Sequence, residues 1–276
     1  MEIRIFSDVL CTWCYGEEKV LRAIDYIYGG AIKFKNIMGG MIADYHDILP
    51  MNMKDKDSNE EANKILRTIW VSGSTIHKMP VMKDEPKLLS REKPSGYYFD
   101  VLFVAARLTD EKKANDFLRE FRFATILYGK NTLDERVAAS IAKSVGIDED
   151  EYLGNIELAK EVFLEDRVWA FDLRMTTFPN FMYIDDNRKE YVLKGYKNFK
   201  QLSEFIDRFG TFEKKKIFLN EDEVLNFIKH YKKVFLPELV EVFENEEEIK
   251  LILENLQKRD VIEINPVGTG EEILLK

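Results

Sequence analysis

Apolar side chains follow strand-like and helix-like patterns in turn over the first forty residues. Residues 2–8 alternate polar and apolar side chains, as in a strand at the edge of a sheet. Over residues 20–28 the apolar positions recur at helical spacing. Residues 31–38 alternate again and end at the glycine pair 39–40. The start of the chain therefore predicts a strand, a helix and a second strand.

Helical periodicity dominates the next part of the chain, about residues 44–175. The expected helices are one that Ser58 caps and that reaches Trp70, then 98–108, 116–127, 134–145 and 151–174, the last as one helix or two. Strand patterns return at 181–185 and 190–193, and a helix is expected at 198–209. The predicted order is β-α-β, a helical block, a β-hairpin and a helix. The aromatic residues of the block are expected in its core; they are Tyr97, Tyr98, Phe99, Phe103, Phe117, Phe121 and Phe123.

The last part of the chain, residues 211–276, has a pattern of its own after a lysine run at 214–216 that resembles a linker. Three helices and a hairpin are expected, at 221–233, 237–243, 246–259 and 261–275. This order is typical of a winged-helix module, which often binds DNA. The segment carries 10 Lys and Arg against 15 Asp and Glu, a net charge of −5. Because phosphate would be repelled, we expect contact with protein instead, either the N-terminal domain or a partner.

Composition narrows the class of protein. The 276 residues are 45% hydrophobic, enough for an ordinary packed core, and the formal net charge is −9. That charge argues against binding to nucleic acid or to an anionic membrane. The chain shows no signal-peptide pattern at its start and no apolar run near the roughly 20 residues that a membrane span needs. We therefore expect a cytoplasmic protein.

The two cysteines of the chain, Cys11 and Cys14, lie in one Cys-Thr-Trp-Cys motif between the first strand and the first helix. At a helix start, unpaired backbone N–H groups favour a thiolate on the first cysteine. The second cysteine, one turn on, is close enough to resolve a mixed disulfide. Structural zinc usually needs four ligands, and the histidines (His46, His77 and His230) show no ligand spacing. The motif predicts dithiol–disulfide exchange, with Cys11 attacking, Cys14 resolving and no metal or cofactor.

The acidic pair Glu17 and Glu18 follows the motif by one turn. Either side chain could relay a proton to Cys14. Exposed carboxylates are the norm, however, so we expect both at the surface.

Two stretches carry a resemblance to a known family. Residues 8–16, Asp-Val-Leu-Cys-Thr-Trp-Cys-Tyr-Gly, resemble the Asp-x-x-Cys-Pro-Trp-Cys-Tyr signature of the FrnE-type branch of the DsbA-like family, with Thr12 in place of proline. Residues 177–181, Thr-Phe-Pro-Asn-Phe, match the element before the third strand. The resemblance implies an α/β protein with a thioredoxin fold and a large helical insertion at about 44–175, all within a domain 1–210. It also implies that Pro179 is cis and faces the two cysteines.

The same resemblance suggests further site residues and substrates. Trp13 inside the motif and Phe178 before the proline are expected to contact substrate. Phe178 is bulkier than the Val or Thr common in the family, and Thr12 changes the dipeptide that tunes the redox couple. Substrates would be thiol-containing proteins or glutathione-like molecules. Whether the chain oxidises, reduces or isomerises them stays open.

Two other families resemble parts of the chain. The DsbA-like domain together with the tail, especially residues 225–229 and 256–263, is similar to the cytoplasmic adaptor family that presents the Spx regulator to the ClpXP protease. Such a role is protein binding and would not need two cysteines. The kappa-class glutathione transferases and chromene-carboxylate isomerases share the fold but have serine at the nucleophile position. The presence of Cys11 and Cys14 favours redox chemistry over both alternatives.

Overall fold

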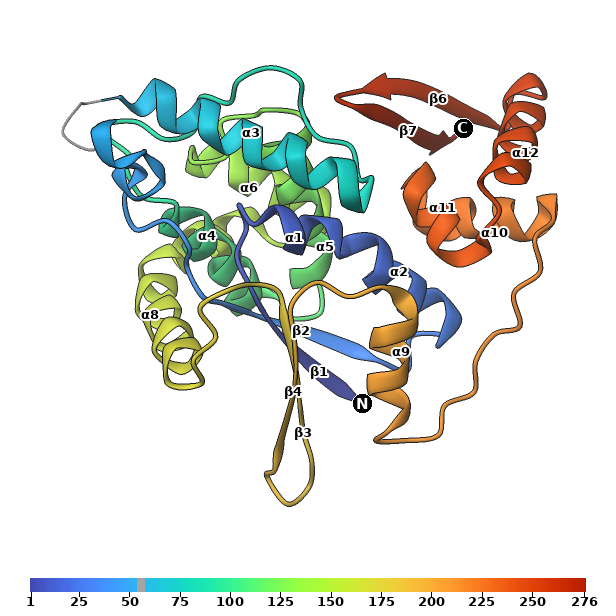
Figure 1. The fold of residues 1–276 in the computed structure, drawn as a ribbon, viewed down its shortest axis with the longest axis horizontal. Helices are drawn as coiled ribbons and strands as arrows, with labels where there is room; N and C mark the ends of the chain where they lie inside the picture. The colour runs from blue at the N-terminus through green and yellow to red at the C-terminus, as the bar shows by residue number, and fades with distance from the viewer. Residues whose placement is uncertain (54–57) are drawn as a thin grey trace.

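The computed structural model describes residues 1–53 and 58–276, and its first sheet has four strands (Figure 1). These are β1 (Glu2–Ser7), β2 (Lys33–Met38), β3 (Asn180–Ile184) and β4 (Glu190–Lys194), in the order β2-β1-β3-β4. Strand β1 pairs in parallel with β2 and antiparallel with β3. The prediction that the first strand lies at an edge is wrong. Its alternating pattern reflects one face that is only partly covered, at Glu2 and Arg4, rather than a missing neighbour.

Two layers of helices enclose this sheet. The short helix α1 (Thr12–Gly16) leads into α2 (Glu18–Ile27), which packs with α9 (Phe199–Asp207) on one face, around a core that includes Ile5 and Phe181. The helical insertion covers the other side. Its elements are η1 (Tyr45–Ile48), η2 (Met51–Met53), α3 (Asn59–His77), α4 (Tyr97–Thr109), α5 (Ala114–Arg122), η3 (Phe123–Leu127), α6 (Glu135–Ser144), α7 (Glu149–Gly154) and α8 (Ile156–Asp172). This is the thioredoxin fold with a helical insertion that the sequence predicted.

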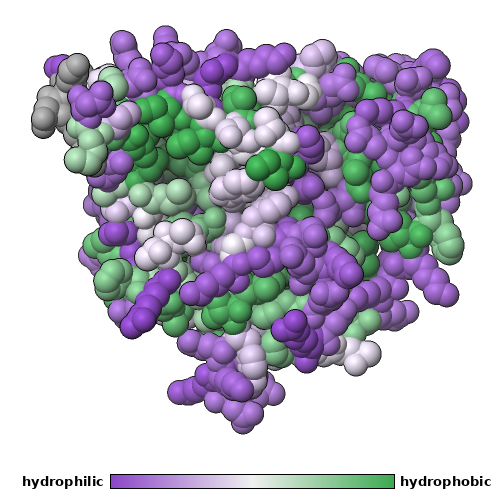
Figure 2. All heavy atoms as spheres, in the orientation of Figure 1, coloured by the Kyte–Doolittle hydropathy of each residue, from purple (hydrophilic) through white to green (hydrophobic). Residues whose placement is uncertain are grey.

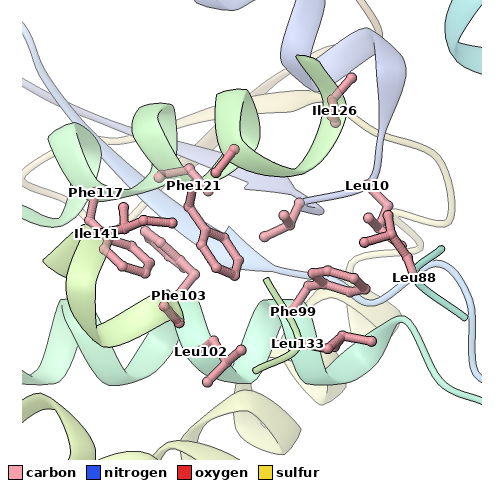
Figure 3. Close-up of a cluster of buried hydrophobic side chains, with 14 of the residues drawn as sticks. Leu10, Leu88, Phe99, Leu102, Phe103, Phe117, Phe121, Ile126, Leu133 and Ile141 are labelled. Carbon is pink, nitrogen blue, oxygen red and sulfur yellow. The ribbon is translucent and has the colours of Figure 1, made fainter. Parts of the chain in front are cut away.

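Aromatic side chains fill the core of the insertion (Figure 3). The rings of Phe117 and Phe121 stack with centroids 5.0 Å apart, and Phe99 and Phe103 are fully buried beside them. Tyr97 and Tyr98 are half-buried at the edge of the cluster. The expected aromatic core is confirmed. The segment 151–174 forms two helices, because the helical conformation is interrupted at residue 155, between α7 and α8.

Residues 211–276, here called the C-terminal module, form a second unit that packs against α2 through α11 (Figure 1). Its elements are α10 (Glu221–Tyr231), β5 (Lys233–Phe235), α11 (Leu236–Phe243), α12 (Glu246–Lys258), β6 (Ile262–Val267) and β7 (Gly270–Leu275), and its sheet has the order β5-β7-β6. The three helices and the hairpin appear where the sequence predicted them, whereas the short strand β5 was missed. Mostly hydrophilic side chains cover its outward surface (Figure 2). The winged-helix assignment and the domain boundary at residue 210 stay predictions.

The C-terminal module is firmly packed on the rest of the chain. Phe235 is fully buried, and its ring lies 4.9 Å from that of Phe123 in the core of the insertion. At the hairpin tip, the Thr269 N–H donates to the Val81 carbonyl at 2.8 Å, and its hydroxyl accepts from the Val81 N–H at 3.0 Å. Gly268 has a φ of +51° there, and a Cβ at this position would lie 2.2 Å from the Val81 carbonyl oxygen. Only glycine fits this contact.

The described residues include no helix that combines the length and the apolar character needed to cross a bilayer.

The packing of Phe235 generates a stability prediction. Phe235→Ala should lower the free energy of unfolding by about 3 kcal/mol or more, because it leaves a cavity between the module and the insertion. Urea unfolding of the whole chain measures the change. The matched control is Phe218→Ala in the same module, since Phe218 is 64% exposed. It should change the free energy by less than about 0.5 kcal/mol. Equal effects of the two substitutions would contradict the proposed packing.

Candidate active site

Both cysteines lie at the junction between the first strand and the first helix, as predicted. Cys11 is the N-cap residue of α1, in an extended conformation, and its sulfur accepts a hydrogen bond from the Cys14 N–H at 3.3 Å. Both side chains are free thiols and each is 2% exposed. The sulfurs are therefore close together and enclosed by protein in this reduced form.

Residues predicted to contact substrate lie around these sulfurs. The Phe178–Pro179 peptide bond is cis, as the family resemblance implied, and the Cys11 thiol donates to the Phe178 carbonyl at 3.6 Å. The Phe178 ring packs directly over Gly39, where a Cβ would lie 1.9 Å from it. Trp13 is half-buried, with its ring 5.6 Å from that of Tyr196. The structure thus brings Cys11, Cys14 and Phe178 into one apolar cluster, with Trp13 at its border.

A pair of buried carboxyl groups holds the loop before the motif. The Asp8 carboxylate accepts from the Leu10 N–H at 2.8 Å and from the Met41 N–H at 2.7 Å, and Asp100 accepts from the Val9 N–H at 2.9 Å. Burial raises the pKa of both groups, and the nearby charge of Asp8 raises the pKa of Asp100 further. The role of Asp100 was not predicted from the sequence, because this residue lies within the strongly apolar run that forms α4.

His77, at the end of α3, supports the motif helix from outside. Its Nδ1 accepts from the Met79 N–H at 3.1 Å, and its Nε2 lies 3.2 Å from the Thr12 hydroxyl. Burial, with the charge of Lys19, lowers the pKa of His77 to about 4, so the ring is neutral near pH 7. Because Nδ1 is an acceptor, the ring proton is on Nε2 and is donated to Thr12. The sequence pattern indicated only that His77 lacks the spacing of a zinc ligand.

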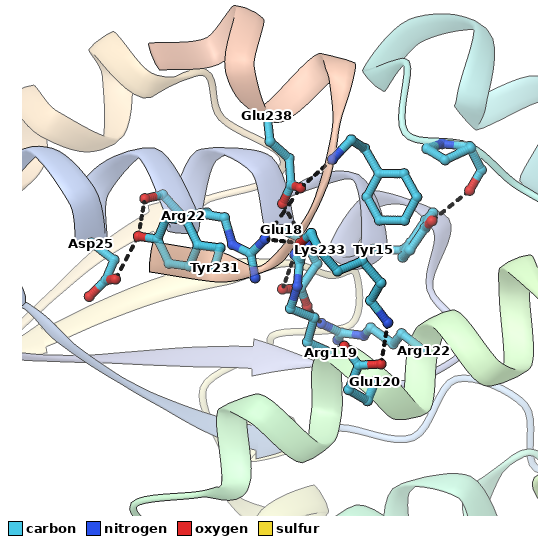
Figure 4. A network of polar contacts seen from close by, with 12 residues as sticks. Tyr15, Glu18, Arg22, Asp25, Arg119, Glu120, Arg122, Tyr231, Lys233 and Glu238 are labelled. Carbon is cyan, nitrogen blue, oxygen red and sulfur yellow. Dashed lines mark hydrogen bonds and ion pairs between the residues drawn. The ribbon is translucent and has the colours of Figure 1, made fainter. Parts of the chain in front are cut away.

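The buried guanidinium of Arg122 (Figure 4) contributes positive charge to the dithiol site. Arg122, at the end of α5, donates to the Glu18 carboxylate at 2.6 Å, to the Ser7 hydroxyl at 2.6 Å and to the Asp8 carbonyl at 3.1 Å. The residue is 1% exposed. Sequence reasoning missed it, although a charged residue between Phe121 and Phe123 in an aromatic run was a signal.

The two thiols differ in their ionisation. Burial raises the pKa of Cys11 well above its ordinary value, and the neighbouring Cys14 sulfur raises it further. Burial also acts to raise the pKa of Cys14, but the hydrogen bond from Cys11 and the charge of Arg122 outweigh it, so the pKa of Cys14 is lowered. The helix start was expected to favour a thiolate on Cys11. In this closed form the positive charge of Arg122 favours Cys14 instead.

The acidic pair after the motif is buried, so its predicted surface location is wrong. Glu17 is 1% exposed and Glu18 is 8% exposed. One Glu17 oxygen accepts from the Lys197 N–H at 3.0 Å, and the other has no hydrogen-bond partner. Burial raises the pKa of Glu17 well above 4.5, and the charge of Cys14 adds to the effect. Glu18 is ion-paired with Arg122. Other elements cover both faces of α2, which a local charge pattern does not reveal.

The fold and the site define a class of protein: a thioredoxin-fold chain with a helical insertion and a CxxC motif between β1 and α1. A family profile described as thioredoxin matches residues 5–205, and the chain belongs to that family. Two solved structures with a similar fold are a putative protein disulfide isomerase from Nitrosomonas europaea and the cytosolic disulfide reductase DsbM from Pseudomonas aeruginosa. Their TM-scores are 0.59 and 0.57 at 19% and 17% identity, over 75% of this chain and 96% and 98% of theirs.

Curated relatives include the ClpXP adapter protein SpxH of two bacteria. The protein from Shouchella clausii is 25% identical over 196 residues, which are 70% of this chain and 61% of that protein. The protein from Halalkalibacterium halodurans is 23% identical over 278 residues, 98% of this chain and 87% of that protein. The chain thus spans less than two thirds of the first relative. The family profile and the fold together show a thioredoxin-family chain with a helical insertion, and its sequence is similar to ClpXP adapter proteins named SpxH.

The buried carboxyl group of Glu17 generates a pH prediction. A carboxyl whose pKa is raised on folding carries no penalty below about pH 4.5, and the penalty grows as the pH rises from there towards the raised pKa. Glu17→Gln should therefore be more stable than the native chain at pH 7, by roughly 1 kcal/mol or more, with an advantage that shrinks towards pH 4. Urea unfolding between pH 4 and pH 8 measures it. The exposed Glu165→Gln is the control, and a pH-independent advantage of Glu17→Gln would contradict the assignment.

Proposed function

We propose that the chain is a cytoplasmic thiol–disulfide oxidoreductase that uses the Cys11–Cys14 pair. The observation that carries the proposal is the enclosed pair of free thiols at the strand–helix junction, joined by the hydrogen bond from the Cys14 N–H to the Cys11 sulfur. Disulfide-exchange names among the structural neighbours are consistent with it. The substrates would be disulfides of proteins or of glutathione-like thiols, and no cofactor is required.

In the reducing direction the reaction has two exchanges. The Cys11 thiolate attacks a substrate disulfide, which forms a mixed disulfide and releases one substrate thiolate. Cys14 then attacks the Cys11 sulfur, closes the Cys11–Cys14 disulfide and releases the second substrate sulfur. The two thiol protons end on the two substrate sulfurs, so the substrate gains two electrons and the cysteine pair loses two. The oxidising direction is the reverse.

Residues around the pair have roles in this proposal. Glu17 exchanges a proton with Cys14, because one of its oxygens is buried without a hydrogen-bond partner and its pKa is raised in part by the charge of Cys14. Trp13 and Phe178 contact the substrate, and the Phe178 carbonyl that precedes Pro179 lies next to the Cys11 sulfur. Since each cysteine residue is only 2% exposed, the substrate reaches Cys11 only after the neighbouring Phe178 and Trp13 side chains have moved.

The roles of the two thiols lead to a trapping prediction. Cys14→Ser should accumulate mixed disulfides through Cys11, whereas Cys11→Ser should lower exchange to the background rate. Mass spectrometry after reaction with oxidised glutathione under non-reducing conditions identifies the trapped cysteine. Mixed disulfides that form mainly at Cys14 in the Cys11→Ser variant would reverse the assignment. Because the pKa of Cys14 is lowered, attack by Cys14 is the competing outcome, and this experiment distinguishes it from attack by Cys11.

The direction of the reaction depends on the reduction potential of the Cys11–Cys14 couple. Equilibration with glutathione buffers measures it. A potential of about −270 mV implies a reductase, and one of about −120 mV implies an oxidant.

A protein-binding adaptor is the second candidate function. The observation that favours it is the alignment with a ClpXP adapter protein over 98% of the chain, which includes the C-terminal module. We propose that the module, residues 211–276, is the winged-helix-like part that contacts the partner, and that it does not bind DNA.

An adaptor needs no thiols, which separates the two candidates. A Cys11→Ser/Cys14→Ser double variant should keep full stimulation of Spx degradation by ClpXP if the chain is an adaptor, while it loses all disulfide exchange. Degradation of purified Spx over time is the measurement. No stimulation by the native chain would refute the adaptor function. Binding of the native chain to duplex DNA that weakens steeply with salt would refute the proposed ligand class of the module.

A further inference from the structure

We propose that Glu238, in the C-terminal module, is a positioning residue of the dithiol site. It acts through Arg119, Glu18 and Arg122, and it sets how much positive charge Arg122 directs to the cysteine pair. The inference rests on the proposed exchange chemistry and deepens it, because it assigns part of the site to a module more than 200 residues away in sequence.

Glu238 is an ionisable residue that the module inserts into the N-terminal domain. It lies in α11 and is completely buried. One carboxylate oxygen is 2.7 Å from an Arg119 guanidinium nitrogen. The other accepts from the Phe235 N–H at 2.8 Å and from Arg22 at 3.4 Å. Two guanidinium groups and a backbone N–H therefore hold this buried carboxylate in place.

From Glu238 a chain of alternating charges leads through Arg119 and Glu18 to Arg122 (Figure 4), whose charge acts on Cys14. Arg119 also pairs with Glu18, at 3.8 Å, and Glu18 pairs with Arg122, at 2.6 Å. Arg122 then donates to Ser7 and to the Asp8 carbonyl, at the end of the strand that leads into the motif. Each of these four residues is less than one-tenth exposed, so solvent screens their interactions weakly. Arg119 and Glu18 each have two charged partners, so a change at Glu238 alters the pairing of Arg122.

Other charged groups also face the two ends of this chain. Asp8, Asp100, Glu17 and His77 lie around the motif, in the preceding loop, in α4, at the end of α1 and at the end of α3. Of these, Glu17 also interacts with the charge of Glu241 in the module, and Glu241 is not part of the Glu238 chain. At the module end, Glu241 pairs with Lys19 at 2.7 Å, and Lys233 pairs with Glu120. All of these groups stay unchanged when Glu238 alone is altered, so they cannot produce the effect expected below.

Glu238→Gln tests the inference in the full-length chain. Loss of one negative charge leaves Arg119 free to pair fully with Glu18, and Arg122 is then more available to the thiolate. The pH midpoint of alkylation of the cysteine pair should fall by roughly half a unit, which is about threefold more thiolate below the midpoint. The reduction potential should become more positive, because the reduced form is stabilised.

Two further variants isolate the charge effect from a loosened interface. Glu272→Gln removes one negative charge from another contact between module and insertion, the 2.5 Å hydrogen bond from the Tyr128 hydroxyl, which lies outside the charge chain. It should leave both the midpoint and the potential unchanged. The double variant Arg119→Gln/Glu238→Gln removes opposite charges together, so its midpoint should return towards that of the native chain. Equal shifts for Glu238→Gln and Glu272→Gln, or no shift for Glu238→Gln, would overturn the inference.

A measurement on the native chain covers the case in which Glu238→Gln does not fold. Coupling is reciprocal, so the redox state of the cysteines should change the stability of the module contact. Amide hydrogen exchange in α11 should therefore differ several-fold between the oxidised and reduced chain, and identical exchange would refute the coupling. Alkylation reads the thiolate even if the chain exchanges no disulfides. A failed exchange assay would thus refute the proposed function without deciding the role of Glu238.

Discussion

The buried guanidinium of Arg122 is the interaction on which the arrangement of the motif depends. Burying such a cation costs several kcal/mol of free energy unless hydrogen-bond acceptors surround it. Glu18, the Ser7 hydroxyl and the Asp8 carbonyl provide those acceptors. They lie at the end of β1 and the start of α2, on the two sides of the CxxC motif. Satisfying this one cation therefore fixes the strand, the motif helix and α5 relative to one another, and it leaves positive charge beside the thiols.

This constraint also explains why an acidic module packs so closely on an acidic domain. Glu18 is enclosed because α2 is covered on its far side, where Ala23 and Tyr26 pack in the core of the C-terminal module. The module has a net charge of −5, yet two acids at its contact surface, Glu238 and Glu241, pair with Arg119 and Lys19. Net charge describes the outer surface of the module, whereas the interface depends on a few paired groups.

Local features of the fold were predictable and long-range ones were not. The strands, the insertion and the CxxC motif follow from side-chain periodicity and from residues adjacent in sequence. The burial of Glu17 depends on Lys197 and the role of Arg122 on Glu18, partners 180 and 104 residues apart in sequence. The strand β5 has only three residues and exists because it pairs with β7. A pattern read over a few neighbouring residues contains none of this information.

Thr12, the departure from the family signature, illustrates the same point at the scale of one residue. The His77 ring carries its proton on Nε2, because Nδ1 accepts from the Met79 N–H, and it donates that proton to the Thr12 hydroxyl. A proline side chain has no acceptor for this hydrogen bond. The close approach also requires Gly73, where a Cβ would lie 2.4 Å from the Thr12 hydroxyl oxygen. Threonine, histidine and glycine therefore act as one unit that anchors the motif helix to α3. In the family signature the ring of proline stiffens this turn, and here a hydrogen bond to a neutral, buried imidazole takes that place.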